Sequence, residues 1–352
     1  MKNFVGRWLS RDPKPIKALT RRGVATSGIV VSALLATVSF VQAKPIVQGP
    51  DLTWHLSLWG EPRPFTKGAE RLSALLSAST GGRWKLELHY RSTLAKPYRN
   101  FDGLKEKKFQ AAAFCTFFHP SKTPALGALS LPFLPLGTWD NNRKVRDAAY
   151  ADQAVRKEAE SHGVHLYTST YLPPYELIGV GKPPREPDDW DGRVIRAGGG
   201  IGRAAKVLGG IVGSSIPSEM YNDFQTGALH MAALPFSYAH VGYKLHEVAQ
   251  WFTTNLAPGS ADCPLAFSLH AYTSLPDAYK ALLEQVRADV AAAQIAAYQA
   301  IDATNLPILK AKLQAISVTS AERNALFEAA GKPVIEDWIK HHEKQFAARE
   351  LI

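Results

Sequence analysis

The chain has 352 residues, enough to bury a large core, and its length favours two domains over one. Its net charge of +10 does not indicate a nucleic-acid-binding protein, because residues 1–43 carry seven basic residues and only one acidic residue. Without that segment the charge is modest, which suits solubility and gives no case for a phosphate-binding surface.

Residues 1–43 have the layout of a secretory signal peptide. A basic region ends at Arg22, a moderately apolar run follows, and Val41-Gln42-Ala43 offers a cleavage site before Lys44. We therefore expect a periplasmic protein whose mature chain begins near Lys44. Polar residues interrupt the apolar run, which makes it a poor membrane span, and an uncleaved anchor is the alternative. Thr20-Arg21-Arg22 resembles a twin-arginine export signal, and a chance arginine pair is the other explanation.

Alternating strands and helices are predicted for the first half of the chain. The clearest strand is residues 84–90, where apolar and polar residues alternate strictly. Further strands are expected at residues 52–58, 109–114 and 165–169, and helices at residues 67–77, 101–107 and 139–161. Strands that alternate with helices in this way are typical of an α/β fold.

The second half continues this pattern and adds long helices. Strands are expected at residues 176–180, 194–195 and 265–270, and a helix near residues 238–247. The longest helix should begin after Pro276, a favoured position for proline, and run to about Ala303. Two further helices, at about residues 320–330 and 334–350, are expected to close the chain.

Arg196 is the main candidate for ligand binding. It follows the β-branched pair Val194-Ile195 and precedes three glycines, Gly198 to Gly200, and a helix. Open α/β sheets bind ligands beyond the carboxyl ends of their strands, so Arg196 stands where a ligand is expected. Its guanidinium can donate two parallel hydrogen bonds to a carboxylate, and the glycines would let backbone N–H groups approach an anion. The alternative is a structural ion pair with a nearby carboxylate: Asp188, Asp189 or Asp191.

The stretch around Arg196 resembles a known family. Trp190-x-Gly192-x-x-x-Arg196 is followed by a short helix ending in Leu208-Gly209, then by Pro217-Ser-Glu-Met-Tyr221 and Phe224-Gln-Thr-Gly227. In this order the motifs resemble the substrate-binding proteins of tripartite ATP-independent periplasmic (TRAP) transporters, of the dicarboxylate-binding-protein type. The resemblance extends from about Trp54 to the C-terminus.

The resemblance implies an α/β protein with two lobes, of the type II-like periplasmic solute-binding kind, with a long helix that braces both lobes. Lobe I would comprise residues 44–173 plus about 260–298, and lobe II residues 174–259 plus about 299–352. Residues 171–175 would form the first crossover between the lobes, and the chain would return near residues 257–262.

The resemblance also implies a function. Such a protein closes around a small organic carboxylate and delivers it to the membrane subunits of a TRAP transporter, which an ion gradient drives. It is not an enzyme and needs no cofactor or metal, and we expect a monomer. The carboxylate-binding arginine of the family lies at the motif position that Arg196 occupies here.

Other residues are weaker candidates for the site. Glu176 lies near the first crossover, where it would bind a substrate hydroxyl or amine, orient Arg196, or simply face solvent. Relatives often have an Asp-Gly pair in place of His230-Met231 and a polar amide in place of Leu234, so we expect a more apolar pocket. Five aromatic residues near strand ends favour a ligand with an aromatic or partly apolar body, although each is individually more typical of a core: Trp59, Phe117, Phe118, Phe236 and Tyr238.

Two alternatives to a transport function stay open. A secreted α/β hydrolase would use a histidine such as His230, but the sequence has no GxSxG elbow and no HExxH motif. A binding module that serves a sensor cannot be told apart from a transport protein by sequence. The two cysteines, Cys115 and Cys263, are expected to be buried free thiols, with a disulfide as the alternative.

Overall fold

The computed structural model describes residues 46–215 and 219–352. The expected signal peptide and its cleavage site lie outside the described residues, as do Pro217 and Ser218 of the motif that follows Arg196. Within the described ranges, no helix combines the length and apolar character needed to cross a bilayer.

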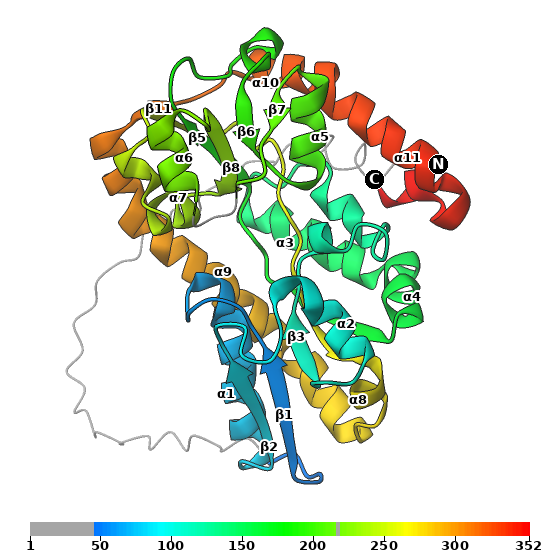
Figure 1. The fold of residues 1–352 in the computed structure, drawn as a ribbon. Helices are drawn as coiled ribbons and strands as arrows, with labels where there is room; N and C mark the ends of the chain where they lie inside the picture. Colours follow the sequence, from blue (N-terminus) through cyan, green and yellow to red (C-terminus); the bar gives the residue numbers. More distant parts are fainter. Residues whose placement is uncertain (1–45, 216–218) are drawn as a thin grey trace, which may run out of the picture.

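The chain forms two α/β lobes, each with its own sheet. In Figure 1 lobe I is at the bottom and lobe II is at the top. Lobe I is built on a five-stranded sheet in the order β2-β1-β3-β10-β4. Its strands are β1 (Leu52–Ser57), β2 (Trp84–His89), β3 (Ala111–Ala113), β4 (Val164–Ser169) and β10 (Pro264–Ser268). Its helices are α1 (Lys67–Thr80), α2 (Asn100–Lys105), α3 (Trp139–Ala151), α4 (Gln153–Ser161) and α8 (Leu269–Thr273).

The single helix expected at residues 139–161 is divided in two by Asp152. The backbone of Asp152 is extended, and its carboxylate accepts hydrogen bonds from the N–H groups of Ala154 and Val155 at the start of α4. Aspartate favours this capping geometry over a helix interior, because its short side chain competes for backbone N–H groups. The periodic pattern of charged residues therefore extends across Asp152, although one helix ends and the next begins there.

Lobe II is built on a six-stranded sheet in the order β11-β9-β5-β8-β6-β7. Its strands are β5 (Tyr175–Gly179), β6 (Val194–Arg196), β7 (Ile211–Val212), β8 (Met231–Pro235), β9 (Trp251–Thr253) and β11 (Gln314–Ile316). Its helices are α5 (Gly199–Val207), α6 (Met220–Thr226), α7 (Tyr238–Gly242) and α10 (Ser320–Leu326).

Each sheet contains one antiparallel strand, and in both lobes it is the strand that follows a crossover. β5 runs antiparallel to β8 and β9, and β10 runs antiparallel to β3 and β4. A strand that begins at the junction of the lobes must run away from it, so its antiparallel neighbours run toward the junction. The residues that follow β1, β6 and β8 therefore meet between the lobes, which is where open sheets bind ligands.

The helix α9 (Asp277–Lys312) braces both lobes. It contacts α1 and β4 in lobe I and α7 and β11 in lobe II, and its 36 residues span about 54 Å. We expected it to end near Ala303, but it continues past Pro307 to Lys312. Leu309 is fully buried in the core of lobe II, so packing accounts for the helical turns that follow Ala303.

The last helix contacts lobe I as well as lobe II. A π-helical turn (Phe327–Gly331) joins α10 to α11 (Lys332–Phe346), so the two expected C-terminal helices are continuous. Trp338 and Ile339 of α11 share a small core with Ala128 and Leu131 of lobe I. The C-terminal segment, which the sequence assigned to lobe II, thus crosses the junction at its end.

A buried ion pair holds the two crossovers together in lobe I. Arg146 of α3 and Asp262, just before β10, are both fully buried, with Nη1 and Oδ1 2.5 Å apart. Arg146 also donates to the carbonyl of Leu172 in the first crossover and to Ser260 in the second. Tyr150 donates to the other carboxylate oxygen of Asp262, at 2.8 Å. Both crossovers are therefore fixed to α3 by the same buried charge.

Cys115 and Cys263 form a disulfide, so the expectation of free thiols was wrong. Cys115 follows β3 and Cys263 precedes β10, and these two strands are antiparallel neighbours in the sheet of lobe I. Their pairing brings the two Cα atoms to 3.9 Å across a sequence separation of 148. No sequence spacing signals this contact, because it depends on the second crossover returning beside β3.

We predict that removing the disulfide destabilises the folded protein. The double variant Cys115→Ala/Cys263→Ala should lose about 2–5 kcal/mol of unfolding free energy, because the bond restricts a long loop in the unfolded chain. Chemical denaturation of the oxidised wild-type protein and the variant measures this difference. Alkylation of the unfolded, unreduced wild-type protein should find no free thiol, and two reactive thiols would contradict the pairing.

Candidate functional site

Arg196 lies at the end of β6, at the junction of the two lobes. Beside it in the sheet is β8, which places Arg196 opposite Ala232. Its Nη1 is 3.5 Å from the carbonyl oxygen of Ala233, a long and weak contact. Among the described residues no carboxylate forms an ion pair with Arg196, so the expected alternative of a pair with Asp188, Asp189 or Asp191 finds no support. Asp189 instead pairs with Lys182.

A second guanidinium, that of Arg63, reaches the junction from lobe I. It follows β1 and precedes the short helix η1 (Pro64–Thr66). Its Nη1 donates to the carbonyls of Trp59 and Glu61, and its Nε lies 3.2 Å from the hydroxyl of Tyr238 in lobe II. No ion pair of Arg63 occurs within the described ranges, so this cation too lacks a carboxylate. Nothing in the sequence around it suggested a role in the site.

Three tyrosines lie close to the two guanidinium groups. Burial raises the pKa of Tyr175 to about 12, against the opposing field of Arg196. Partial burial also raises the pKa of Tyr243, while the charges of both Arg63 and Arg196 act to lower it. The hydroxyl of Tyr175 has no hydrogen-bond partner in the described part of the chain. Tyr175, Tyr238 and Tyr243 therefore offer neutral hydroxyl donors beside two cations that form no ion pair with any described residue, a combination suited to an oxygen-rich anion.

The aromatic candidates do not all lie together. The half-buried Trp59 ring lies beneath the Arg63 guanidinium, 5.7 Å from its carbon atom, so both belong to the same part of the junction. Phe236 packs instead in lobe II against Phe252 and His240. Phe117 and Phe118 lie in the short helix η3 (Thr116–Phe118) of lobe I, 37 and 40 % exposed and in contact with each other. Whether any of these residues touches a ligand stays a prediction.

Glu176 is buried and engaged by the chain itself. Its carboxylate accepts hydrogen bonds from the hydroxyl of Thr253 at 2.5 Å and from the backbone N–H groups of Leu256 and Ala257. Only 3 % of the residue is exposed, so it does not face solvent. Burial raises its pKa to about 7, although these hydrogen bonds oppose the rise. The contacts favour a structural role, in which Glu176 fixes the start of the second crossover, over direct binding of a ligand.

Leu234 and the glycines after Arg196 differ from their expected roles. Leu234 is 2 % exposed and packs in the core of lobe II, so it gives no evidence for an apolar pocket. A Cβ on Gly200 would come within 2.3 Å of the Ser130 carbonyl oxygen, so this glycine allows α5 to approach lobe I. Gly198 has open space at that position. Only part of the glycine run is therefore free for an anion.

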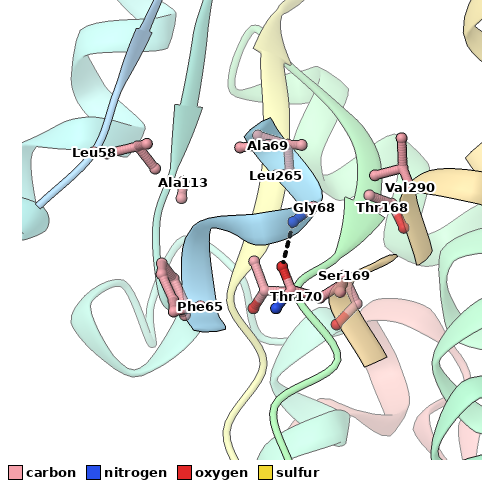
Figure 2. A pocket seen from close by; sticks show the side chains of 11 residues that line it. Leu58, Phe65, Gly68, Ala69, Ala113, Thr168, Ser169, Thr170, Leu265 and Val290 are labelled. Atoms are coloured by element: carbon pink, nitrogen blue, oxygen red, sulfur yellow. Dashed lines mark hydrogen bonds between the residues drawn. The ribbon is translucent and has the colours of Figure 1, made fainter. Parts of the chain in front are cut away.

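The small cavity of lobe I is not a solute site. It lies among η1, α1, α9 and the end of β4. At its border the Gly68 N–H donates a hydrogen bond to Gln294 Oε1, drawn as a dashed line in Figure 2. Its volume of about 10 Å³ is that of a single water molecule. A second, open hollow of about 640 Å³ lies between α1 and α9, and Arg63 lines one side of it. Arg63 is thus the charged residue that borders both this hollow and the junction.

His230 does not have the setting of a catalytic histidine. Its Nδ1 accepts a hydrogen bond from the backbone N–H of Val194, at 2.9 Å. A general base in a nucleophile–histidine pair instead needs a serine, threonine or cysteine side chain within hydrogen-bond reach. No such contact to His230 occurs among the described residues, so this geometry gives no support to the hydrolase alternative.

We predict a pH-dependent effect of replacing Glu176 with glutamine. The folded pKa of about 7 exceeds the ordinary value of 4.5, so between these pH values the folded state binds more protons than the unfolded state. Glu176 therefore contributes less to stability as pH rises through this window. Glu176→Gln removes that titration. The stability difference between wild type and Glu176→Gln, measured by thermal unfolding from pH 5 to pH 8, should narrow as pH rises. A difference that widens would mean that the carboxylate is ionised in the fold.

The comparisons with known proteins agree with this architecture. Residues 57–341 match the sequence profile described as bacterial extracellular solute-binding protein, family 7. No curated protein sequence matches. Three similar solved structures are all TRAP periplasmic solute-binding proteins. The one from Ochrobactrum anthropi, with its C-terminus bound in the ligand-binding pocket, has a TM-score of 0.75 and 20% identity over 86% of this chain and 95% of that one.

The second, from Desulfovibrio salexigens with bound orotic acid, has a TM-score of 0.73 and 19% identity, covering 85% of this chain and 96% of that one. The third, from Sulfitobacter sp. NAS-14.1 with bound β-D-galacturonate, has a TM-score of 0.73 and 17% identity, covering 85% of this chain and 99% of that one. At such identities the structures establish the fold alone, whereas the profile covers most of the chain. The chain therefore belongs to the bacterial extracellular solute-binding proteins of family 7.

Proposed function

We propose that this protein binds a small organic carboxylate between its lobes and delivers it to a TRAP-type secondary transporter. The observation that carries the proposal is the pair of guanidinium groups, Arg63 from lobe I and Arg196 from lobe II, that lack carboxylate partners in the described ranges. A ligand that pairs with both cations would hold the lobes together. Closure then follows from tighter binding to the closed state, as in hinge-bending proteins.

The ligand class follows from the groups that surround the two arginines. Arg196 would bind the carboxylate through its guanidinium, and the tyrosine hydroxyls would donate to further oxygen atoms. The relatives from Desulfovibrio salexigens and Sulfitobacter hold orotic acid and β-D-galacturonate, which are both carboxylates on a ring. Trp59 and Tyr238 would suit such a ring by contact with its face. We therefore propose a ring-bearing or hydroxylated carboxylate as the solute.

Delivery to a transporter requires export, which we propose from residues 1–43. The basic region, the apolar run and Val41-Gln42-Ala43 should direct the chain to the periplasm, where a monomer would circulate between solute and membrane subunits. N-terminal sequencing of protein from the periplasmic fraction should find a chain that begins near Lys44. An intact Met1 on a membrane-bound form would show instead that the segment is an anchor. A chromosomal neighbour that encodes a sensor in place of a transporter would favour the sensory alternative.

We predict that Arg196 contributes most to solute affinity. If it forms a desolvated bidentate pair with a carboxylate, Arg196→Ala should cost about 2–5 kcal/mol, or roughly 30-fold to several-thousand-fold in Kd. Arg196→Lys should recover only part of this, because an ammonium cannot reproduce the guanidinium geometry. Arg63→Gln should also weaken binding, since it removes the second cation while keeping hydrogen-bond donors.

The measurement is calorimetric titration with the solute that mass spectrometry finds in natively purified protein, beginning with orotate and galacturonate as trial ligands. Arg349→Ala is the matched control, because Arg349 is an exposed arginine that pairs with Glu336 on the C-terminal helix. Circular dichroism confirms that each variant is folded. Binding by folded Arg196→Ala within about twofold of wild type, an effect below roughly 0.4 kcal/mol, would show that the site lies elsewhere.

A further inference from the structure

Two histidines and a glutamate form a cluster on one face of the sheet of lobe I. They are His55 on β1 and Glu87 and His89 on β2. The two strands are parallel, with His55 opposite Glu87 and Ser57 opposite His89. All three side chains therefore project from the same face of the sheet, and one atom from each lies within 4.8 Å of the others.

The strand pattern separates the cluster from the apolar core of lobe I. Trp54, Leu56 and Leu86 alternate with the cluster and are buried against α1 and α9 on the opposite face. β2 is the edge strand of the sheet, so the cluster lies at the margin of this face, whereas Ser57 on the same face is buried beneath Asn100 of α2. The side chains of His55 and Glu87 are 44 and 52 % exposed, which leaves them accessible to an ion from solution.

The distances within the cluster suit a metal ion. His55 Nδ1 lies 2.9 Å from His89 Nε2 and 3.4 Å from a carboxylate oxygen of Glu87. With metal–nitrogen bonds of 2.0–2.1 Å, an N···N distance of 2.9 Å gives an N–metal–N angle of roughly 90°. The tetrahedral angle would require the two nitrogens to lie only about 0.4 Å further apart. Because the side chains are partly exposed, rotation of the imidazole rings can increase the N···N distance by this amount.

The protonation states are also compatible with metal binding. Without a metal, one of the two facing nitrogens must donate a hydrogen to the other. With a metal, both facing nitrogens are ligands, and each ring carries its proton on its outer nitrogen. The outer nitrogens, His55 Nε2 and His89 Nδ1, have no hydrogen-bond partner in the described part of the chain, so water can satisfy them. Lys85, two residues before Glu87 on the same face of β2, is exposed and can extend into solvent.

We propose that His55, Glu87 and His89 bind a divalent transition-metal ion of the zinc type. Two imidazole nitrogens and one carboxylate oxygen form a three-ligand set that Zn²⁺ accepts, with water in the fourth position. Hard cations such as Ca²⁺ and Mg²⁺ prefer sites made wholly of oxygen atoms, so the site discriminates against them. The ion would link the edge strand β2 to β1 at a position where His55 and Glu87 are exposed.

The test is calorimetric titration of Zn²⁺ into the untagged mature chain after treatment with a chelator, together with the absorption spectrum of the Co²⁺ complex. We expect one bound Zn²⁺ per chain and the Co²⁺ bands of a low-symmetry, four-coordinate site. Removing a ligand should weaken binding by about tenfold or more, so His55→Ala and His89→Ala should both show this loss. Glu87→Gln replaces an exposed carboxylate at nearly constant shape and should weaken binding without any effect on folding.

His341→Ala is the matched control, because His341 is also an exposed histidine beside a carboxylate, with Asp337 at 3.2 Å. It should leave Zn²⁺ affinity unchanged, as should Arg196→Ala, so failure of the metal site and failure of the proposed solute site are separable. Absence of Zn²⁺ binding by the wild-type chain would overturn the proposal. The proposal would also be overturned if Glu87→Gln and the folded histidine variants bound Zn²⁺ as tightly as wild type. It would be overturned as well if His341→Ala weakened Zn²⁺ binding as much as the ligand variants do.

Discussion

The buried pair of Arg146 and Asp262 is the interaction on which the two-lobe arrangement depends. Two charges removed from water are stable only if their remaining hydrogen-bonding groups are satisfied, and here Asn142, Tyr150 and Ser260 supply partners. Removing one partner of such a pair typically costs about 3–5 kcal/mol, because the other charge stays buried without compensation. The pair lies where the two crossovers must keep a fixed position relative to one another.

The position of this pair has a consequence for motion between the lobes. Arg146 fixes the first crossover through the Leu172 carbonyl and the second through Ser260 and Ala261. The disulfide adds a covalent tie between the second crossover and β3. Both crossovers are thus part of lobe I up to these residues. Any hinge must lie beyond them, nearer to Tyr175 and Ala257, where the chain joins the sheet of lobe II.

The helix α9 would limit the proposed closure of the lobes. It is continuous through both lobes, and its Tyr298 lies between Trp139 of lobe I and Tyr238 of lobe II, with rings 5.9 Å apart on each side. At the lobe II end, Asn305 donates to the Ser237 carbonyl, which ties the start of α7 to the helix. Rotation about an axis near α9 keeps these contacts, whereas separation of the lobes would break them.

Periodicity and motif order were enough to predict the α/β class, most strands and the position of Arg196, because these depend on local patterns. They could not identify Arg146, since it lies in a helix with several other charged residues and its burial depends on crossovers distant in sequence. Arg63 lies in a loop with no periodic pattern, and its contact with Tyr238 spans 175 positions. The cysteine pairing likewise depends on strand order. These three features could not be predicted because they depend on tertiary contacts between segments that lie far apart in the chain and that the crossovers bring together.

The same reasoning changes the expected chemistry of the proposed solute site. Leu234 and Phe236 suggested an apolar pocket, but Leu234 is buried in the core of lobe II and Phe236 packs against that core. Three tyrosines lie near the two arginines as well, and these side chains combine an apolar ring with a polar hydroxyl. A purely apolar body would leave those hydroxyls without partners on closure, at a cost in affinity. A solute with oxygen atoms around a ring would satisfy them, so the hydroxyl groups, more than ring contact alone, should determine which carboxylate binds.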